Sequence, residues 1–288
     1  MDPIWEGFVA RLGELGVTPN RARVAVVSGE NGAVAPEDVA LGIEKERPDV
    51  VVSISEPLAD AVVARFHGRV PLVLLAISER FTLRYTETLA NRPGSGVTGV
   101  VDHCRALEQL RALRRLVPAV RRVGVLYDPI FPPAELPTEA ARSLGLDLDV
   151  RAARTAEQVR EQLRLFEERR IQALWVNAIY ASDHSVFEGF PEIAEHARAR
   201  RLPLVTDTWV NLRRGALVAR TSSAPEAGRV GAERVASLLA GADPGTLPVH
   251  ALGCGPILVN GETARRIGVE IPEALRGEAS VLGDAKVE

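Results

Sequence analysis

Three glycines, Gly94, Gly96 and Gly99, have the G-x-G-x-x-G spacing of a phosphate-binding turn, in the stretch RPGSGVTGVVD. In dinucleotide-binding enzymes these glycines follow a strand and open a helix, and an acidic residue comes about 20 positions later. Here they lead into Val97–Val101, which has the pattern of a strand, and a helical pattern starts only after Asp102. We therefore interpret them as glycines that let the chain cross between two lobes, because glycine adopts positive φ at little steric cost.

Polar and aromatic side chains that could bind a small ligand follow several apolar, β-branched runs. In open α/β sheets, ligands bind beyond the carboxyl ends of the strands. A desolvated ammonium group needs a carboxylate or amide partner, for which Asp207 is the first candidate, and an aromatic ligand needs rings to stack on. Two alternatives remain open, since Ser55 could cap a helix and Asp207 could be a cap or a turn residue. The candidate ligand-binding residues from this pattern are Ser53, Ser55, Ser78, Glu79, Tyr127, Asp128, Asn177, Asp207 and Trp209.

The elements that must position these residues alternate between strand and helix patterns. Alternation of this kind predicts βαβ units, parallel sheets and right-handed crossovers, and a chain of this many elements divides into two Rossmann-like lobes. Predicted strands cover residues 23–29, 49–55, 70–78, 96–101, 122–128, 146–153, 173–178 and 202–207. Predicted helices cover residues 5–15, 39–46, 58–66, 105–116, 138–143, 156–169 and 190–200. The stretch RRGALVARTSSAPEAGRVGAERVASLLAGADPG has the pattern of a strand, a turn and a long helix, LPVHALGCGPILVN that of another strand region, and GETARRIG that of a short helix. Core packing is the predicted role of Trp175. The tail that begins with Ala274 has weak patterning and is expected to fray.

Patterns of known catalytic and metal sites are absent from the sequence. It has no C-x-x-C, no H-E-x-x-H, no G-x-S-x-G nucleophile elbow and no Walker loop, and its five histidines are scattered. We expect no catalytic residue, no metal and no cofactor. For the two cysteines, Cys104 and Cys254, we favour two small buried apolar side chains over a disulfide, which stays open.

Composition and charge limit the possible partners. The 288 residues include 46% hydrophobic and 25% charged residues, with a formal net charge of −3, which fits a globular protein of two domains. No basic stripe predicts nucleic-acid binding, and no apolar run approaches the roughly 20 residues of a membrane span. The N-terminal stretch MDPIWEGFVARLGELG lacks the pattern of a secretory signal.

Four stretches resemble a known family. They are RPGSGVTGVVD, LRALRRLVPAVRRVGVLYDP, RRGALVARTSSAPEAGRVGAERVASLLAGADPGTLPV and ILVNGETARRIGVEIPEAL. They look like the substrate-binding proteins of a group of ABC transporters whose members are thought to carry tryptophan or tyrosine, and the resemblance runs from Trp5 to Leu275.

The resemblance implies the type I periplasmic binding protein fold, with two α/β lobes joined by three crossovers and a ligand in the cleft between them. The implied N-terminal lobe comprises residues 1–100 and 210–244, and the implied C-terminal lobe comprises residues 101–209 and 245–288. The implied function is capture of a small molecule by hinge closure and delivery to an ABC permease, by a monomer. An intracellular ligand-sensing domain of the same fold, and an enzyme on a two-lobed α/β scaffold, are the alternatives.

Two second-lobe loops depart from the family pattern. The tyrosine is followed by DPIFPPAELP instead of a polar run, and AIYASD is inserted after ALWVN, so that Asp183 matches the loop aspartate of the family. The ligand is therefore expected to be amino-acid-like, or aromatic and less polar. The chain also begins at a helix where the family begins with a signal segment and a strand, so we favour a missing upstream segment. The expected location is extracytoplasmic, periplasmic or lipid-anchored, if such a segment exists, and cytoplasmic if the chain is complete.

Overall fold

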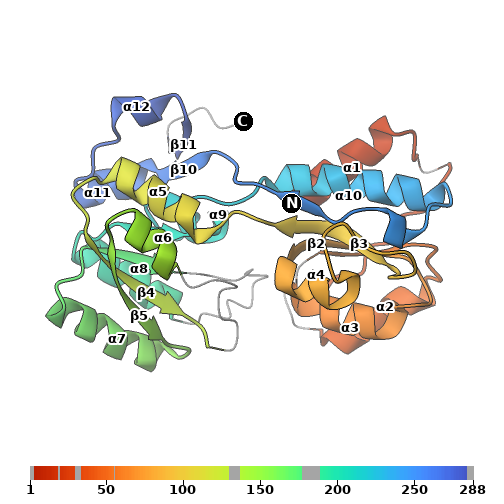
Figure 1. Cartoon of the computed structure of the whole chain (residues 1–288), viewed down its shortest axis with the longest axis horizontal. Coiled ribbons are helices and arrows are strands. Elements are labelled where there is room, and N and C mark those ends of the chain that lie inside the picture. Colours follow the sequence, from red (N-terminus) through yellow and green to blue (C-terminus); the bar gives the residue numbers. More distant parts are fainter. Residues whose placement is uncertain are drawn as a thin grey trace. The chain divides into compact units, whose positions relative to one another are not determined.

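A computed structural model of the chain describes residues 3–18, 20–29, 34–54, 56–129, 137–176 and 189–283, and it contains two compact α/β units (Figure 1). Unit 1 comprises Met1–His103 and Ser222–Gly253, and unit 2 comprises Cys104–Thr221 and Cys254–Glu288. Each unit has its own mainly parallel sheet. The prediction of two α/β lobes joined by three chain crossings is therefore confirmed.

The crossings lie later in the chain than the boundaries at residues 100, 209 and 244 predicted above. They follow His103, Thr221 and Gly253. Strand β8 (Val218–Ala219) pairs with β7 (Leu204–Thr206) in unit 2, so the second crossing comes only after it. Strand β9 (His250–Leu252) pairs with β3 (Val97–Asp102) in unit 1, which delays the third crossing. Both strands lie in stretches with the sequence pattern of strands, but that pattern does not show which sheet a strand joins, so only their pairing assigns them to a unit.

The sheet of unit 1 has the strand order β1-β2-β3-β9, with every pair parallel. Strand β1 is Val51–Ile54 and β2 is Leu72–Ser78. Alternate residues of β2 face opposite layers: Val73 and Leu75 pack in one core cluster, and Leu72 and Leu74 pack in another. The first cluster joins the sheet to α1 (Pro3–Glu14) and α10 (Ala224–Leu239). The second cluster includes residues of α2 (Pro36–Lys45), α3 (Glu56–Phe66) and α4 (Glu79–Thr86).

The predicted strand at residues 23–29 is wrong. The structure assigns no strand to these residues, and the Val24 and Val26 side chains are 52% and 68% exposed. In the described part of unit 1, β1 pairs with β2 alone and is an edge of the sheet. A β-branched run forms a strand only when a neighbouring strand pairs with its backbone N–H and C=O groups. The sequence pattern does not show whether such a neighbour exists, so the prediction from the pattern alone was wrong.

Helices α1 and α10 lie side by side in unit 1 and approach closely at two glycines (Figure 1). A Cβ atom on Gly228 would lie 1.9 Å from the Ile4 carbonyl oxygen, and one on Gly7 would lie 2.1 Å from the Pro225 carbonyl oxygen. Only glycine therefore permits this distance between the two backbones.

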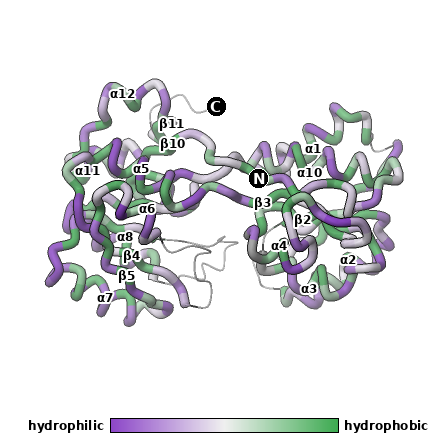
Figure 2. The backbone as a smooth tube through the Cα atoms, in the orientation of Figure 1, coloured by the Kyte–Doolittle hydropathy of each residue, from purple (hydrophilic) through white to green (hydrophobic). Residues whose placement is uncertain are grey.

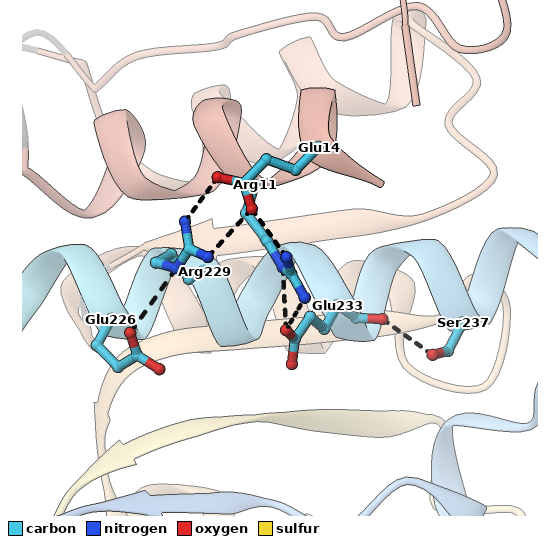
Figure 3. A network of polar contacts seen from close by, with 6 residues as sticks. All are labelled: Arg11, Glu14, Glu226, Arg229, Glu233 and Ser237. Atoms are coloured by element: carbon cyan, nitrogen blue, oxygen red, sulfur yellow. Dashed lines mark hydrogen bonds and ion pairs between the residues drawn. The ribbon is translucent and has the colours of Figure 1, made fainter. Parts of the chain in front are cut away.

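Ion pairs cross the same helix interface at its solvent-facing side (Figure 3). The Arg11 guanidinium lies 2.8 Å from a Glu14 carboxylate oxygen and 2.7 Å from Glu233. Arg229 donates to Glu14 at 3.0 Å and lies 3.9 Å from Glu226. The two arginines lower the pKa of Glu14 to about 2, chiefly through the hydrogen bond from Arg229. The 3₁₀ turn η2 (Pro244–Thr246) follows α10 in the same unit.

The sheet of unit 2 has the order β11-β10-β8-β7-β6-β4-β5, and only the β10–β8 pair is antiparallel. The tail, for which weak patterning indicated little structure, contributes a helix and the edge strand β11. The remaining strands are β4 (Arg122–Tyr127), β5 (Asp147–Ala152), β6 (Ala173–Val176), β10 (Ile257–Asn260) and β11 (Ala279–Leu282). The helices are α5 (Ala106–Leu116), α6 (Thr138–Ser143), α7 (Ala156–Glu168), α8 (Phe190–Ala199), α9 (Trp209–Arg213), α11 (Gly261–Ile267) and α12 (Glu273–Arg276).

Strand β6 shows how both faces of the unit 2 sheet are buried. Trp175 and Ala173 belong to one core cluster, with residues of α5 and α11, and Leu174 and Val176 belong to the other, with residues of α7 and α8. The Trp175 indole nitrogen donates to the Gln109 side-chain oxygen at 2.8 Å, and the predicted core position of Trp175 is confirmed by its 1% exposure. Hydrophilic and hydrophobic residues alternate along the surrounding helices (Figure 2), as expected of helices with one buried face. Among the described residues, no helix has the length and apolarity needed to cross a membrane.

Candidate functional site

The glycine stretch that suggested a phosphate-binding turn lies in unit 1, in the loop that enters β3. Gly94 and Gly96 have φ values of +78° and +70°, and Gly99 lies inside the strand, where a Cβ atom would be 2.1 Å from the Leu74 carbonyl oxygen. The following helix begins only at Ala106. The expectation that no strand-to-helix phosphate turn forms here is confirmed. The glycines do not form the crossing itself, because the chain passes to unit 2 after His103.

Three predicted ligand-binding residues lie at the carboxyl edge of the unit 1 sheet. Ser53 is 4% exposed in β1, and its hydroxyl has no hydrogen-bond partner among the described residues. Ser78 ends β2, and Glu79 opens α4 directly after it. The fourth, Ser55, lies outside the described residues. A buried hydroxyl without a partner favours a ligand or water at that point, because buried polar groups are otherwise hydrogen-bonded.

A histidine that the sequence pattern did not select joins this edge. The Glu79 carboxylate lies 2.8 Å from the His103 Nδ1 atom, and both side chains are about one-third exposed. Strands β2 and β3 are paired with Ser78 opposite Asp102, so the two residues that follow them meet. The sequence evidence for His103 as a site residue was weak, because His103 follows a predicted strand but belongs to no metal-binding or catalytic motif.

A second group missed from the sequence is a polar contact between Asp102 and Ser222. The Ser222 hydroxyl lies 2.6 Å from an Asp102 carboxylate oxygen and 2.9 Å from the Leu252 carbonyl oxygen. These three residues are neighbours of the three chain crossings, all on the unit 1 side. The contact could be found only after β9 had been paired with β3, because more than 100 residues separate Asp102 from the other two.

Four predicted residues lie at the carboxyl edge of the unit 2 sheet. Tyr127 ends β4 and is half-buried, and Asp128 follows it at 3% exposure. Asp207 follows β7 and is half-buried. Trp209 is the first residue of α9 and is 36% exposed. Strand β6 lies between β4 and β7 and runs parallel to both. The predicted residues that follow β6, Asn177 and Asp183, lie outside the described residues.

The structure narrows the alternatives for Asp207. The cap of α9 is Thr208, whose hydroxyl accepts from the Asn211 backbone N–H at 3.2 Å, so the cap hypothesis for Asp207 is wrong. The chain crosses between units only after Thr221, so Asp207 is not a crossing residue either. It remains a turn residue between β7 and α9, two positions before Trp209 in the sequence. The Arg213 guanidinium lies over the Trp209 ring, 5.2 Å from its centroid.

The two cysteines, for which buried apolar side chains were favoured, form a disulfide. Cys104 and Cys254 lie 150 residues apart in the sequence, and their Cα atoms are 4.5 Å apart. Each is the first residue of unit 2 after a chain crossing. The prediction was wrong because the distance between two cysteines far apart in the sequence depends on the fold. Here the fold brings the first and third crossings together. Among the described residues, no group of three or more histidine, cysteine or acidic side chains could hold a metal ion.

Comparisons with known proteins agree with this architecture. Residues 1–282 match the family model of the ABC transporter substrate-binding proteins. A tyrosine-binding protein from Clostridioides difficile is 18% identical over 275 residues, which is 94% of this chain and 78% of the relative.

Two solved structures share the fold. One is a domain from Streptococcus pneumoniae in complex with L-Trp, with 23% identity, a TM-score of 0.79 and coverage of 97% of this chain and 94% of that chain. The other is the open, ligand-free structure of a substrate-binding protein with adhesive properties from Clostridium difficile, with 17% identity, a TM-score of 0.69 and coverage of 98% and 96%. These likenesses support the type I periplasmic binding fold, and with the family match over nearly the whole sequence, the chain belongs to the ABC transporter substrate-binding protein family.

Proposed function

We propose that this chain captures a small amino-acid-like solute, aromatic or weakly polar, and delivers it to an ABC permease. The observation that carries the proposal is the chemistry of the unit 2 strand ends. Two carboxylates, Asp128 and Asp207, lie there with two aromatic side chains, Tyr127 and Trp209. Carboxylates suit an α-ammonium group, and rings suit an apolar or aromatic side chain.

Residues of unit 1 would complete the recognition of such a solute. The partnerless, buried Ser53 hydroxyl can donate to a carboxylate, and the Glu79–His103 pair supplies further polar atoms at the same sheet edge. The relatives named above, one a tyrosine-binding protein and one in complex with L-Trp, support an α-amino acid as the solute class. The apolar stretch DPIFPPAELP after Tyr127 supports a less polar member of that class.

The proposed mechanism is ligand-driven hinge closure with no chemical turnover. A solute that contacts residues of both units binds one arrangement of the units more tightly than the others, and only this difference in affinity shifts the equilibrium. We further propose a monomer that works outside the cytoplasm. The Cys104–Cys254 disulfide supports this location, because structural disulfides persist in oxidising compartments, and it counts against an intracellular sensing domain.

The test compares L-Trp with its des-amino analogue, indole-3-propionate, by calorimetric titration. If Asp207 binds the ammonium group, Asp207→Asn weakens L-Trp binding about 10-fold or more and leaves the weaker binding of the analogue unchanged. The matched control is Asp147→Asn, since Asp147 is an exposed aspartate at the start of β5 in the same unit. An equal loss for both compounds, or none, removes Asp207 from the site.

A further inference from the structure

A pocket of about 310 Å³ lies on unit 2, away from the strand ends that form the proposed solute site. Its volume is at the lower end of the range for small-molecule sites. Two helices and one turn supply its walls. The lining residues are Pro191, Ala194, Glu195 and Arg198 of α8, Arg214 and Gly215 of the turn after α9, and Thr263 and Arg266 of α11.

The spacing of the lining residues shows that one face of α8 and part of one face of α11 line the pocket. The α8 residues follow the pattern i, i+3, i+4, i+7, which is one face of a helix, and Thr263 and Arg266 are three apart on α11. The Thr263 hydroxyl donates to the Gly215 carbonyl oxygen at 3.3 Å and joins α11 to the turn. The small residues Ala194 and Gly215 leave the space open, with the Ala194 Cβ atom 3.8 Å from a Cβ position on Gly215.

The part of the pocket formed by Arg214, Gly215 and the start of α11 lies at the amino edge of the parallel strands. Strand β10 runs antiparallel to β8, so its carboxyl end, from which α11 starts, lies beside the amino end of β8. The Asn260 N–H donates to the Leu217 carbonyl oxygen just before β8. Tyr127 ends β4 and Asp207 follows β7, so both lie at the carboxyl ends of strands that run in the same direction as β8. A ligand in the pocket would therefore not compete with the proposed solute.

The charge of the lining is positive, with three guanidinium groups and one carboxylate. Arg198 is paired with Glu195 on α8, and Arg266 is paired with Glu262 on α11. The side chains of both pairs are about half exposed. Exposed ion pairs contribute little to stability, so either arginine can leave its glutamate and bind another anion at a small cost in free energy. The structure describes no ion-pair partner for the side chain of Arg214, the third guanidinium.

We propose that this pocket is an accessory site for a multiply charged oxyanion, either free phosphate or a phosphate group of a larger molecule. Arg214 binds two oxygens of the anion through its planar, bidentate donor set, and Arg198 and Arg266 supply the surrounding positive charge. Arginine suits this role because its fixed fork of N–H donors matches the geometry of phosphate and carboxylate oxygens. The site is independent of solute capture, so it can be occupied with or without solute.

The first experiment titrates inorganic phosphate into the protein by NMR or calorimetry, at constant ionic strength maintained with sodium chloride. The proposal predicts saturable binding that Arg214→Ala weakens about 10-fold or more and that Arg214→Lys, which keeps charge but loses the fork, restores only in part. The control is Arg276→Ala, which removes an exposed unit 2 arginine outside the pocket lining, paired with Glu273 at 3.4 Å. The unfolding temperature in chloride verifies that each variant is folded.

A second arm identifies the source of the phosphate group. Vesicles of phosphatidylcholine and phosphatidic acid in a 7:3 ratio are compared with pure phosphatidylcholine vesicles in a sedimentation assay, because the phosphomonoester of phosphatidic acid, like free phosphate, can carry two negative charges. Arg214-dependent binding of free phosphate, of the anionic vesicles, or of both supports the oxyanion site and names its source. If neither probe binds, or if Arg214→Ala and Arg276→Ala behave alike with both probes, the proposal is wrong. Because Asp207 is not involved, a failure here leaves the proposed solute site unaffected.

Discussion

Cys104 and Cys254 form a disulfide at the points where the first and third chain crossings enter unit 2. In unit 1, the same two crossings are held by the pairing of Asp102 with Leu252 and by the His103 N–H, which donates to the Leu252 carbonyl oxygen at 2.9 Å. The disulfide therefore adds a covalent bond directly beyond a pair of hydrogen-bonded strands. It links two segments that are 150 residues apart in the sequence and that strand pairing in unit 1 brings together.

Removal of this disulfide is expected to destabilise the protein markedly. A bond between residues 150 positions apart reduces the conformational entropy of the unfolded chain. Native disulfides typically contribute about 2–4 kcal/mol to the free energy of unfolding. The double variant Cys104→Ser/Cys254→Ser should show that loss in urea unfolding. Wild-type protein treated with a thiol reductant should match it, and equal stability of oxidised and reduced wild type would contradict the prediction.

The close approach of α1 and α10 predicts that Gly228→Ala destabilises unit 1. The new Cβ atom would lie 1.9 Å from the Ile4 carbonyl oxygen, so the helices must separate, at a cost of about 1–3 kcal/mol. Gly13→Ala, in α1 itself, is the matched control. No atom lies within 4 Å of its Cβ position, and alanine favours a helix over glycine by about 0.5–1 kcal/mol. Thermal unfolding should therefore move in opposite directions for the two variants.

Glu14 predicts a specific dependence of stability on pH. Hydrogen bonds from Arg229 and Arg11 lower its pKa to about 2, from the ordinary glutamate value of 4.5. Stabilisation by the ionised carboxylate is fully present above pH 4.5 and is lost as the pH falls through about 2. The stability difference between wild type and Glu14→Gln should shrink over that interval, and it should also shrink in high salt because the pair is exposed.

Glu37→Gln, which removes an exposed glutamate of α2, is the control for this measurement. Chemical unfolding at several pH values gives the stability differences. A wild-type advantage over Glu14→Gln that stays constant from pH 5 to pH 2, or one shared by Glu37→Gln, would show that the ion pairs with Arg11 and Arg229 have no such effect.

The buried hydrogen bond between Trp175 and Gln109 predicts a non-additive pair of substitutions. Gln109→Leu leaves the buried indole N–H without its acceptor and should cost about 1–3 kcal/mol. In the background of Trp175→Phe, which has no N–H to satisfy, the same substitution should cost clearly less. Equal costs in both backgrounds, measured by a double-mutant cycle in urea, would mean that the bond contributes nothing.

The sequence predicted what depends on local periodicity. Long amphipathic patterns predicted helices, as at Ala106–Leu116, and apolar runs predicted strands, as at Arg122–Tyr127. The alternation of helix and strand patterns predicted the two α/β units. Placement at strand ends followed from topology alone, so Tyr127, Asp128 and Asp207 could be selected before any contact was known.

What depends on pairing between distant residues could not be predicted. The run at residues 23–29 has the composition of a strand and no described strand beside it. The strands β8 and β9 lie in stretches with the pattern of strands, but only their pairing shows which sheet each one joins. The disulfide and the Asp102–Ser222 contact likewise join residues more than 100 positions apart.

Equilibrium binding to the wild-type protein is the decisive measurement for the proposal that this chain binds an amino-acid-like, aromatic or weakly polar solute without converting it. Purified protein is screened by thermal shift against amino acids, nucleosides and small carboxylates, and each hit is titrated by calorimetry and recovered for analysis. We expect an aromatic or aliphatic L-amino acid to bind at one site per chain and to be recovered unchanged. A protein that binds none of these amino acids, or that converts the compound it binds, would contradict the proposal.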